Sequence, residues 1–240
     1  MGHGWQGAVL RLMRGKDFTF TVRSNERVSD RLHRLSFSDG GMLRATGVHP
    51  TMWVRLWFES AGRPHQRAYT LVDPDPPTGT FDMEFTLHAG RASEWARTAR
   101  PGDTIEATVQ GSEFAVPDPR PSRLLVVGDA ASRPAIDSLL ASMPQTPATV
   151  WFETAHPSDA DHAPHRGSER HEVIQVPRRD HGGHLVETVR QALPRHMDDG
   201  DRYVWIACDT ATTRTLASFA RRQLAVPRER LHALGYWRAA

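Results

Sequence analysis

Arg67 and Tyr69 stand two residues apart in the stretch Arg67-Ala68-Tyr69-Thr70, which has Gly, Pro and Asp turn residues on both sides. These flanks predict a short strand, whose two-residue period places Arg67 and Tyr69 on one face and Ala68 and Thr70 on the other. A guanidinium pairs with a phosphate, and a tyrosine ring stacks on a planar heterocycle. The stretch therefore favours a flavin nucleotide site. Taken alone, an arginine beside a packed tyrosine on a sheet face is the commoner arrangement.

A second stretch, His88-Ala89-Gly90-Arg91-Ala92-Ser93, lies between a predicted strand at 81–87 and a predicted helix at 92–99. Free N–H groups at the start of the helix, the Ser93 hydroxyl and the charge of Arg91 suit a pyrophosphate. The alternative is an ordinary capped helix after a glycine turn. We expect Trp95 to pack in the core beneath this helix and not to contact a ligand.

Two further positions follow predicted strands in the second half of the chain. Gly128 and Asp129 end the apolar run 123–127, and Cys208 and Asp209 follow the run 203–207. Open α/β sheets bind ligands at the carboxyl ends of their strands, so these residues are candidates by position. Cys208 is expected to be a small buried side chain and not a nucleophile.

Histidine and cysteine usage points away from metal chemistry. Seven histidines fall between His156 and His196, in loops with Pro, Gly and Arg and without a neighbouring cysteine. We interpret them as solvated loop residues and predict no metal site. A single cysteine excludes a disulfide within the chain and an iron–sulfur cluster held by four cysteines of this chain.

The elements that must position these residues fall into two groups. The first half predicts a closed antiparallel barrel of six strands, interrupted by one helix. The expected strands are 18–22, 32–37, 52–58, 67–70, 81–87 and 104–109. The second half alternates strands with helices, which predicts a doubly wound, Rossmann-like α/β domain. A linker at 118–121 sets the expected boundary, with domains at 1–118 and 119–240.

The composition is typical of a folded globular protein. Of 240 residues, 39% are hydrophobic and 24% are charged, and no apolar run is long enough to span a bilayer. The 30 basic residues include one lysine, Lys16, and are balanced by 28 acidic ones, which argues against nucleic acid as a partner. Residues 1–14 lack a secretory signal. We therefore expect a cytoplasmic monomer without membrane insertion.

An N-terminal barrel followed by an α/β domain is a recurring plan of flavin reductases, in which the barrel holds the flavin and the α/β domain brings a nicotinamide. The motifs resemble those of one family within this plan, the siderophore-interacting proteins or ferric-siderophore reductases of the ferredoxin–NADP reductase superfamily. The resemblance rests on RAYT at 67–70, FDMEFTLHAG at 81–90, ASEWA at 92–96, ARPGDTIE at 99–106, VVGDAASRPAI at 126–136, WIACDTATTRTL at 205–216 and GYWR at 235–238.

This resemblance implies a bacterial flavoprotein that uses FAD and either NADPH or NADH to reduce a ferric siderophore and release ferrous iron. The flavin would carry the chemistry, without a catalytic side chain. The flavin and its phosphates would be bound by Arg67, Tyr69, Thr70, Glu84, Thr86, His88, Arg91, Ala92 and Ser93. The nicotinamide side would involve Gly128, Asp129, Asp209, Tyr236 and Trp237.

Three positions differ from the family pattern. Arg91 stands in a shortened loop where the family has proline, Ala130 replaces a glutamate, and Cys208-Asp209 replaces Gly-Glu. The choice between NADH and NADPH stays open. So do two alternatives: a flavin reductase with a different acceptor, and a flavin- or siderophore-binding protein without turnover.

Overall fold

The computed structural model describes residues 15–60, 63–164, 170–197 and 201–238. The chain divides into two compact units, Met1–Phe114 and Ala115–Ala240. Residues 1–14, which were expected to lack a secretory signal, lie outside the described part. Within that part, no helix is both long enough and apolar enough to span a membrane.

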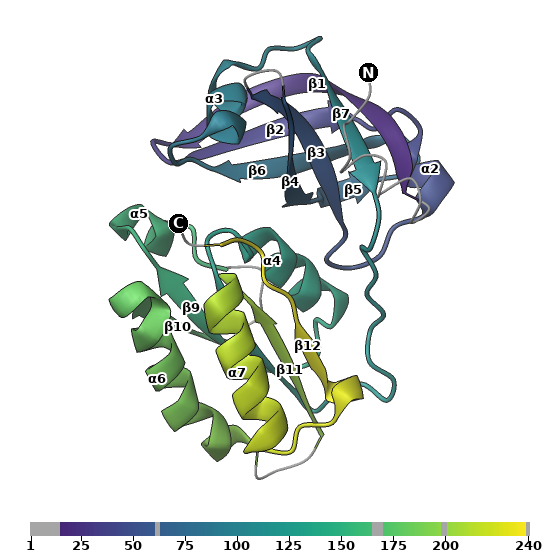
Figure 1. Cartoon of the computed structure of the whole chain (residues 1–240). Coiled ribbons are helices and arrows are strands. Elements are labelled where there is room, and N and C mark those ends of the chain that lie inside the picture. Colours follow the sequence, from purple (N-terminus) through teal and green to yellow (C-terminus); the bar gives the residue numbers. More distant parts are fainter. Residues whose placement is uncertain (1–14, 61–62, 165–169, 198–200, 239–240) are drawn as a thin grey trace. The chain divides into compact units, whose positions relative to one another are not determined.

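In its described residues, the first unit is a curved antiparallel sheet with two short helices (Figure 1). Hydrogen bonds order its seven strands as β4-β3-β7-β1-β2-β6-β5. The strands are β1 (Lys16–Ser29), β2 (Leu32–Ser38), β3 (Trp53–Ser60), β4 (Arg63–Thr70), β5 (Val72–Asp75), β6 (Thr80–Thr86) and β7 (Thr104–Val109). The helices are α2 (Met42–Thr46) and α3 (Arg91–Thr98).

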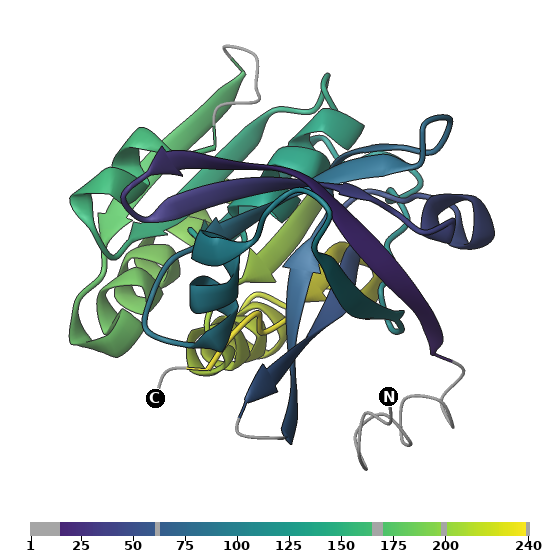
Figure 2. The same ribbon diagram turned by 90° about the horizontal axis from the view of Figure 1, so that it is seen from above.

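Alternation along the strands builds the core of this unit. In β6, Phe81, Met83 and Phe85 are buried, while the residues between them are half-buried. The long strand β1 bends as it leaves one partner for the next (Figure 2). Its first part pairs with β7 and its second part with β2, and Thr21 belongs to both ladders. The bend lets one sheet curl around a single apolar core.

The first unit departs from the predicted six-stranded closed barrel in three ways. The additional strand β5 forms from residues that predict a turn, and α2 is a second helix. Pro74 has no backbone N–H to donate. It is tolerated in β5 because this strand lies at the edge of the sheet, where one side makes no ladder hydrogen bonds. Across the described residues the hydrogen-bonded order is open, from β4 to β5, so the sheet is a half-barrel.

The second unit is a parallel sheet of five strands in the order β10-β9-β8-β11-β12. The strands are β8 (Arg123–Asp129), β9 (Ala148–Thr154), β10 (His171–Pro177), β11 (Arg202–Ala207) and β12 (Leu231–Ala233). The helices are α4 (Arg133–Ser142), α5 (Pro157–Asp161), α6 (Gly183–Ala192) and α7 (Thr210–Arg222), with short 3-10 turns η1 (Asp180–Gly182), η2 (Leu193–His196) and η3 (Arg228–Arg230). The strand order reverses between β8 and β11, which is where open sheets bind ligands.

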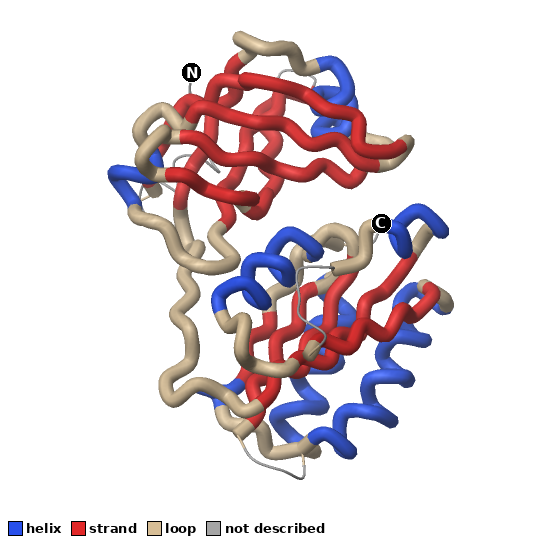
Figure 3. The backbone as a smooth tube through the Cα atoms, turned by 180° about the vertical axis from the view of Figure 1, so that it is seen from behind, coloured by secondary structure: helices blue, strands red, loops and turns tan. Residues whose placement is uncertain are grey.

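Helices cover both faces of this sheet, with α4 on one face and α6 and α7 on the other (Figures 1 and 3). The central strand β8 is therefore buried on both sides, and Leu124 to Val127 have no exposed surface. The prediction of a doubly wound α/β unit is confirmed. The loop region that carries His156 and His162 contains α5, and the C-terminal segment adds the edge strand β12.

Candidate functional site

Tyr69 lies where β4 approaches β6. Its half-buried ring is centred 4.3 Å from the ring of Phe85 and 6.4 Å from that of Phe58. Burial raises the pKa of Tyr69, while the nearby charge of Arg67 opposes the shift, so the phenol stays neutral at physiological pH. Tyr69 therefore offers a fixed aromatic ring with a hydroxyl donor.

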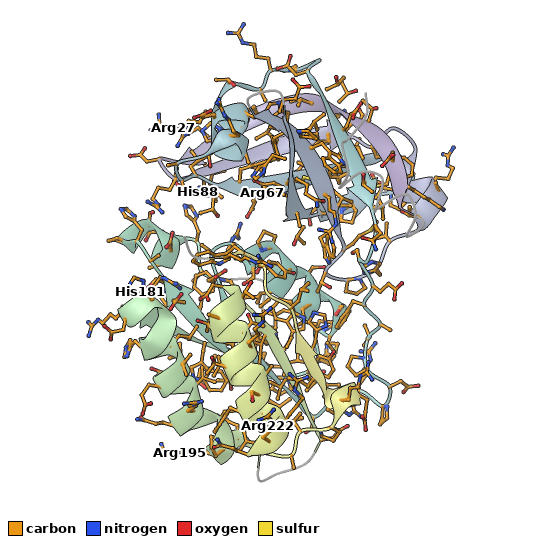
Figure 4. All side chains as sticks on the ribbon, in the orientation of Figure 1. Arg27, Arg67, His88, His181, Arg195 and Arg222 are labelled. Carbon is orange, nitrogen blue, oxygen red and sulfur yellow. The ribbon has the colours of Figure 1, made fainter. Side chains whose placement is uncertain are left out.

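Arg67 occupies the same face of β4 as Tyr69, as the alternation predicts. Across the ladder with β3, Arg67 pairs with Leu56 and Tyr69 pairs with Val54, and both of these partners are buried. Arg67 itself is exposed; Figure 4 labels it together with His88. Its guanidinium donates 2.8 Å to the carbonyl of Gln66 and meets no carboxylate in the described part of the chain. This leaves a cation available to a phosphate.

The start of α3 supplies a second group of donors. Gly90 precedes the helix with a φ of 143°, a conformation that favours glycine, and no side chain caps the helix among the described residues. The first N–H groups of a helix have no partner within it, so those of Arg91 and Ala92 are available to an anion. Arg91 pairs with Glu94 at 3.1 Å, but both side chains are more than half exposed, so this pair is weak.

Ser93 and Trp95 fix this helix on the sheet. The buried Ser93 hydroxyl accepts a hydrogen bond of 3.1 Å from the backbone N–H of His88. The ring of Trp95 lies 5.8 Å from that of Phe58 and 6.0 Å from that of Phe85. Trp95 is half-buried, and the prediction that it packs against the core is confirmed. The aromatic contacts thus join the end of β6 to α3 and to β4.

Three predicted residues do not share this face. Glu84 and Thr86 alternate with the buried Phe85, so their side chains leave β6 on the face opposite to Tyr69. They pair across the ladder with Arg34 and Leu32. Thr70 is buried and lies on the other face of β4 from Arg67.

At the carboxyl edge of the second sheet, three predicted residues come together. The indole of Trp237 donates 2.7 Å to Asp129 Oδ2, and its backbone forms a parallel bridge with Asp209. The backbone N–H of Thr210 donates to the carbonyl of Trp237 at 2.8 Å, and the backbone N–H of Tyr236 donates to the carbonyl of Cys208 at 2.9 Å. The C-terminal segment is thus fixed across the ends of β8 and β11.

Two residues at this edge escape the sequence-based prediction. Glu153 is the last residue but one of β9 and pairs with Asp129, and Arg178 follows β10. Arg178 pairs with Glu153, approaches Asp209 to 3.5 Å and places its guanidinium 4.9 Å from the centre of the Trp237 ring. We call Asp129, Glu153, Asp209, Arg178 and Trp237 the edge network. Glu153 could have been suspected, because it follows the apolar run 148–152 as Asp129 and Asp209 follow theirs.

The carboxylates of Asp129 and Asp209 take up the N–H groups of the adjoining turns. Asp129 Oδ1 accepts from Ala131 and Ser132 at 3.0 and 3.1 Å. Asp209 Oδ1 accepts from Ala211 and Thr212, each at 3.0 Å. These donors hold phosphate in many dinucleotide-binding sheets, but here they are engaged within the chain.

Burial shapes the charges of the edge network. It raises the pKa of Asp129, against hydrogen bonds from Trp237 and Ser132. It also raises the pKa of Glu153, against the attraction of Arg178. For Asp209 burial acts in the same direction, but hydrogen bonds from Thr212 and the charge of Arg178 outweigh it and lower the pKa. Burial therefore disfavours the charged forms of Asp129 and Glu153, whereas the charged form of Asp209 is stabilised.

Gly128 and Cys208 have structural explanations. A Cβ on Gly128 would lie 2.5 Å from Ser132 Oγ and 2.6 Å from Ile136 Cδ1, so glycine lets α4 pack against β8. Cys208 is fully buried, which confirms the prediction of a small buried side chain, and burial raises the pKa of its thiol. Among the loop histidines, His156 caps α5, and His165 lies outside the described residues.

An antiparallel half-barrel followed by a parallel sheet with helices on both faces defines the two-domain flavin oxidoreductase fold of ferredoxin–NADP reductases. A ferredoxin–NADP⁺ reductase from Plasmodium falciparum shares this fold, with a TM-score of 0.69 at 8% identity over 92% of this chain and 97% of that one. A siderophore-interacting protein from Acinetobacter baumannii reaches a TM-score of 0.79 at 19% identity, covering 94% of this chain and 92% of that one.

The chain belongs to the siderophore-interacting protein family. Residues 121–240 match the family model for siderophore-interacting protein, and residues 21–111 match the siderophore-interacting FAD-binding domain. FAD is therefore the cofactor of the first unit, and the free Arg67 and the uncapped start of α3 fit its phosphates.

The chain is also 33% identical over 244 residues to the mycobactin import ATP-binding/permease protein IrtA of Mycolicibacterium smegmatis. That match covers 99% of this chain but only 28% of the relative's length.

Proposed function

We propose that this chain is an FAD-dependent reductase that passes electrons from NADH or NADPH to the iron of a ferric siderophore, as a cytoplasmic monomer. The flavin domain would span residues 1–118 and the nicotinamide domain residues 119–240. The observation that carries the proposal is the pairing of a carboxylate-free Arg67 with the uncapped start of α3, in a chain whose two units both match siderophore-interacting models. Bound FAD supplies the exchange between a two-electron donor and a one-electron acceptor.

The side chains of the first unit would bind and orient the cofactor. Arg67 would pair with a phosphate, and the N–H groups of Arg91, Ala92 and Ser93 would donate to the diphosphate. The ring of Phe85 packs against the ring of Tyr69 and holds it in place, so Tyr69 would set the position of a planar ring of the cofactor. His88 would border the diphosphate. Glu84 and Thr86 stay proposed contacts of FAD. Because their side chains leave the opposite face of β6, these contacts would have to come from their backbone groups.

The second unit would receive the nicotinamide nucleotide at the carboxyl ends of β8 and β11, where the strand order reverses. Gly128, Asp129 and Asp209 line that edge, and Tyr236 and Trp237 cross it. The buried Glu153 Oε1 lacks a partner among the described residues and fits a hydroxyl donor such as a ribose. The proposed nucleotide site thus combines a hydrogen-bond acceptor with the point in the sheet where the strand order reverses.

Release of iron would follow from ligand preference. Siderophores hold ferric iron through hard oxygen ligands, and ferrous iron is held more weakly by the same atoms. An electron delivered to the chelate would therefore free the metal without any metal ligand from the protein. The siderophore and its iron are substrate in this account, and the flavin is the only resident redox group.

An anaerobic titration tests the proposal. The protein is reconstituted with FAD, and its absorbance is followed as NADH or NADPH is added, and then as a ferric siderophore is added with a ferrous-specific chelator present. Bleaching by a nicotinamide and recovery with ferrous iron formed are expected. Bleaching followed by recovery with a quinone but not with ferric siderophore would assign a different acceptor. Flavin that binds but does not bleach with either nicotinamide would leave a binding protein without turnover.

A further inference from the structure

The outer edge of the second sheet is open to pairing with another chain. In the described part of this sheet, β12 comes last in the strand order and pairs with β11 alone. The pairing continues beyond β12, because the N–H groups of Leu234 and Tyr236 donate to carbonyls at the end of β11 and just after it, at 3.0 and 2.9 Å. Trp237 extends it with a parallel bridge to Asp209. Residues 231–237 therefore form one extended segment, which we call the β12 edge.

Half of the backbone groups of the β12 edge point outward. Successive N–H groups of a strand point to opposite sides, and those of Leu234 and Tyr236 point toward β11. The N–H groups of Ala233 and Gly235 therefore point away from it. Both residues are exposed, so their outward groups face solvent. A row of such groups at a sheet edge is a template for a further strand.

The β12 edge lacks the residues that deter strand pairing. At the edge of the first sheet, β5 carries Pro74 between Asp73 and Asp75, and proline and charged side chains oppose the addition of a further strand. Residues 231–237 contain no proline, lysine, arginine, aspartate or glutamate. The sequence of the β12 edge is thus compatible with a partner strand.

A groove with positive charge lies along the β12 edge. It has a volume of about 550 Å³ and is lined by α7, which lies beside β12 (Figure 1), and by the segment 228–238. Among the described residues no aspartate or glutamate lines it. Arg230, next to the groove, pairs with Asp201 at 2.6 Å. By contrast, four exposed arginines line the groove and form no ion pair within the described ranges: Arg214, Arg221, Arg228 and Arg238.

The edge and the groove together indicate the chemistry of a partner. Leu231 packs against the core on the α7 side of the sheet, and every second side chain of an added strand would leave on that same side. Carboxylates at those positions would meet the guanidinium groups of the groove, which are suited to pairing with them. Nucleic acids and lipid headgroups are also anionic, but they have no peptide groups to pair with the β12 edge.

We propose that the β12 edge binds an extended acidic segment of another protein. The segment adds as a further strand beside β12 and places carboxylates at alternate positions, next to the four arginines of the groove. Main-chain hydrogen bonds supply affinity in this mode of recognition, and the alternate side chains supply specificity. The interaction goes beyond the proposed reductase activity and does not depend on it.

A synthetic peptide tests the pairing on the unaltered full chain. The probe is an eight-residue peptide in which glutamate alternates with valine, blocked at both ends and labelled with a dye for fluorescence anisotropy. Two further peptides are N-methylated, one on all glutamates and the other on all valines. Only one of these two sets of N–H groups can face the β12 edge. One N-methylated peptide should therefore bind at least about tenfold more weakly than the probe, and the other within about twofold of it.

Variants of the chain test the two halves of the site. Arg214→Glu combined with Arg228→Glu should weaken binding of the probe at least about tenfold, because it reverses two charges of the groove. Arg195→Glu, at an exposed arginine outside the groove, is the matched control and should leave the Kd within about twofold. Ala233→Pro removes only an outward donor and should also weaken binding, whereas Ala233→Ser keeps that donor and should not. Thermal melts establish that the variants are folded.

Three results would overturn the inference, and none of them needs a variant to fold. The first is a Kd of the probe for the wild-type chain above about 1 mM. The second is an equal effect of the two N-methylated peptides, which would mean that the main chain of the probe is not paired. The third is binding of single-stranded DNA or of phosphatidylglycerol vesicles at least as tight as that of the probe, which would assign the arginines to a different class of partner.

Discussion

The ring of Tyr69 on β4 lies 4.3 Å from the ring of Phe85 on β6, although the hydrogen-bonded order places β3, β7, β1 and β2 between these two strands. The sheet therefore curls until its interior side chains meet across the opening. That contact brings the part of β4 that carries Arg67 beside the end of β6 that leads to His88 and α3. The fold of the first unit thus assembles the proposed phosphate donors from two distant segments.

Tyr69→Ala should weaken the first unit and its hold on FAD. The substitution removes a ring packed between Phe85 and Phe58, at a cost of about 2 kcal/mol for a half-buried aromatic side chain. Tyr69→Phe keeps the ring and should unfold close to the wild type. Urea unfolding of both variants without FAD measures the packing effect. Equal stability of the two variants would contradict the packing role assigned to this ring.

Arg67→Ala should raise the Kd for FAD by about tenfold or more, because a charge-assisted hydrogen bond contributes about 1.5–3 kcal/mol. Arg67→Lys should recover only part of the affinity, since an ammonium lacks the paired donors of a guanidinium. Fluorescence quenching of FAD provides the measurement. Arg100→Ala, at another exposed arginine of the same unit, is the control. An unchanged Kd in Arg67→Ala would remove Arg67 from the site.

Trp237→Phe should destabilise the second unit by about 1–3 kcal/mol, because it removes the donor to the buried Asp129 Oδ2 while leaving a ring beneath Arg178. The effect should shrink when Asp129→Asn is already present, since the two residues act as a pair. A double-mutant cycle by urea unfolding gives the coupling. Additive effects would mean that the Trp237–Asp129 hydrogen bond contributes nothing to stability.

Stability should fall as the pH drops below about 6.5, and His232 should account for part of the loss. Burial lowers the pKa of His232 in the folded protein below its ordinary value of 6.5, and its ring stacks on Trp205 at 5.7 Å. The unfolded chain then binds a proton that the folded chain binds only at lower pH. The stabilisation is thus present above the unfolded pKa and lost as the pH falls through the folded pKa.

His232→Phe keeps a stacked ring without a titrating group, so its unfolding free energy should depend less on pH between about 5 and 7. Chemical denaturation at a series of pH values compares the two proteins. Identical pH profiles would show that His232 does not contribute to the acid sensitivity.

Local periodicity predicted much of this fold and part of the site. The shared face of Arg67 and Tyr69 and the core position of Trp95 follow from neighbours in the chain, so they could be read from the residues themselves. Asp129 and Asp209 were found because each follows an apolar strand. The contact of Asp129 with Trp237 needed the strand order, because these two residues lie 108 positions apart in the chain.

Other features needed three-dimensional information or a closer use of the pattern. Arg178 acts on Glu153 and Asp209 only because β10 neighbours β9, and no local signal encodes that order. Glu84 and Thr86 could have been placed correctly, because strict alternation with Phe85 puts them on the opposite face. The strand β5 escaped prediction because Pro74 and its acidic neighbours have the composition of a turn, and the edge of a sheet tolerates them.

The most direct test of the central claim is a single anaerobic experiment on the FAD-loaded chain. The flavin is bleached with a stoichiometric amount of NADH, a ferric siderophore is added, and ferrous iron is counted with a specific chelator. The account predicts full recovery of the flavin absorbance with about two ferrous ions formed for each NADH consumed, because the donor gives two electrons and each iron takes one. A reduced flavin that stays bleached in the presence of ferric siderophore would contradict it.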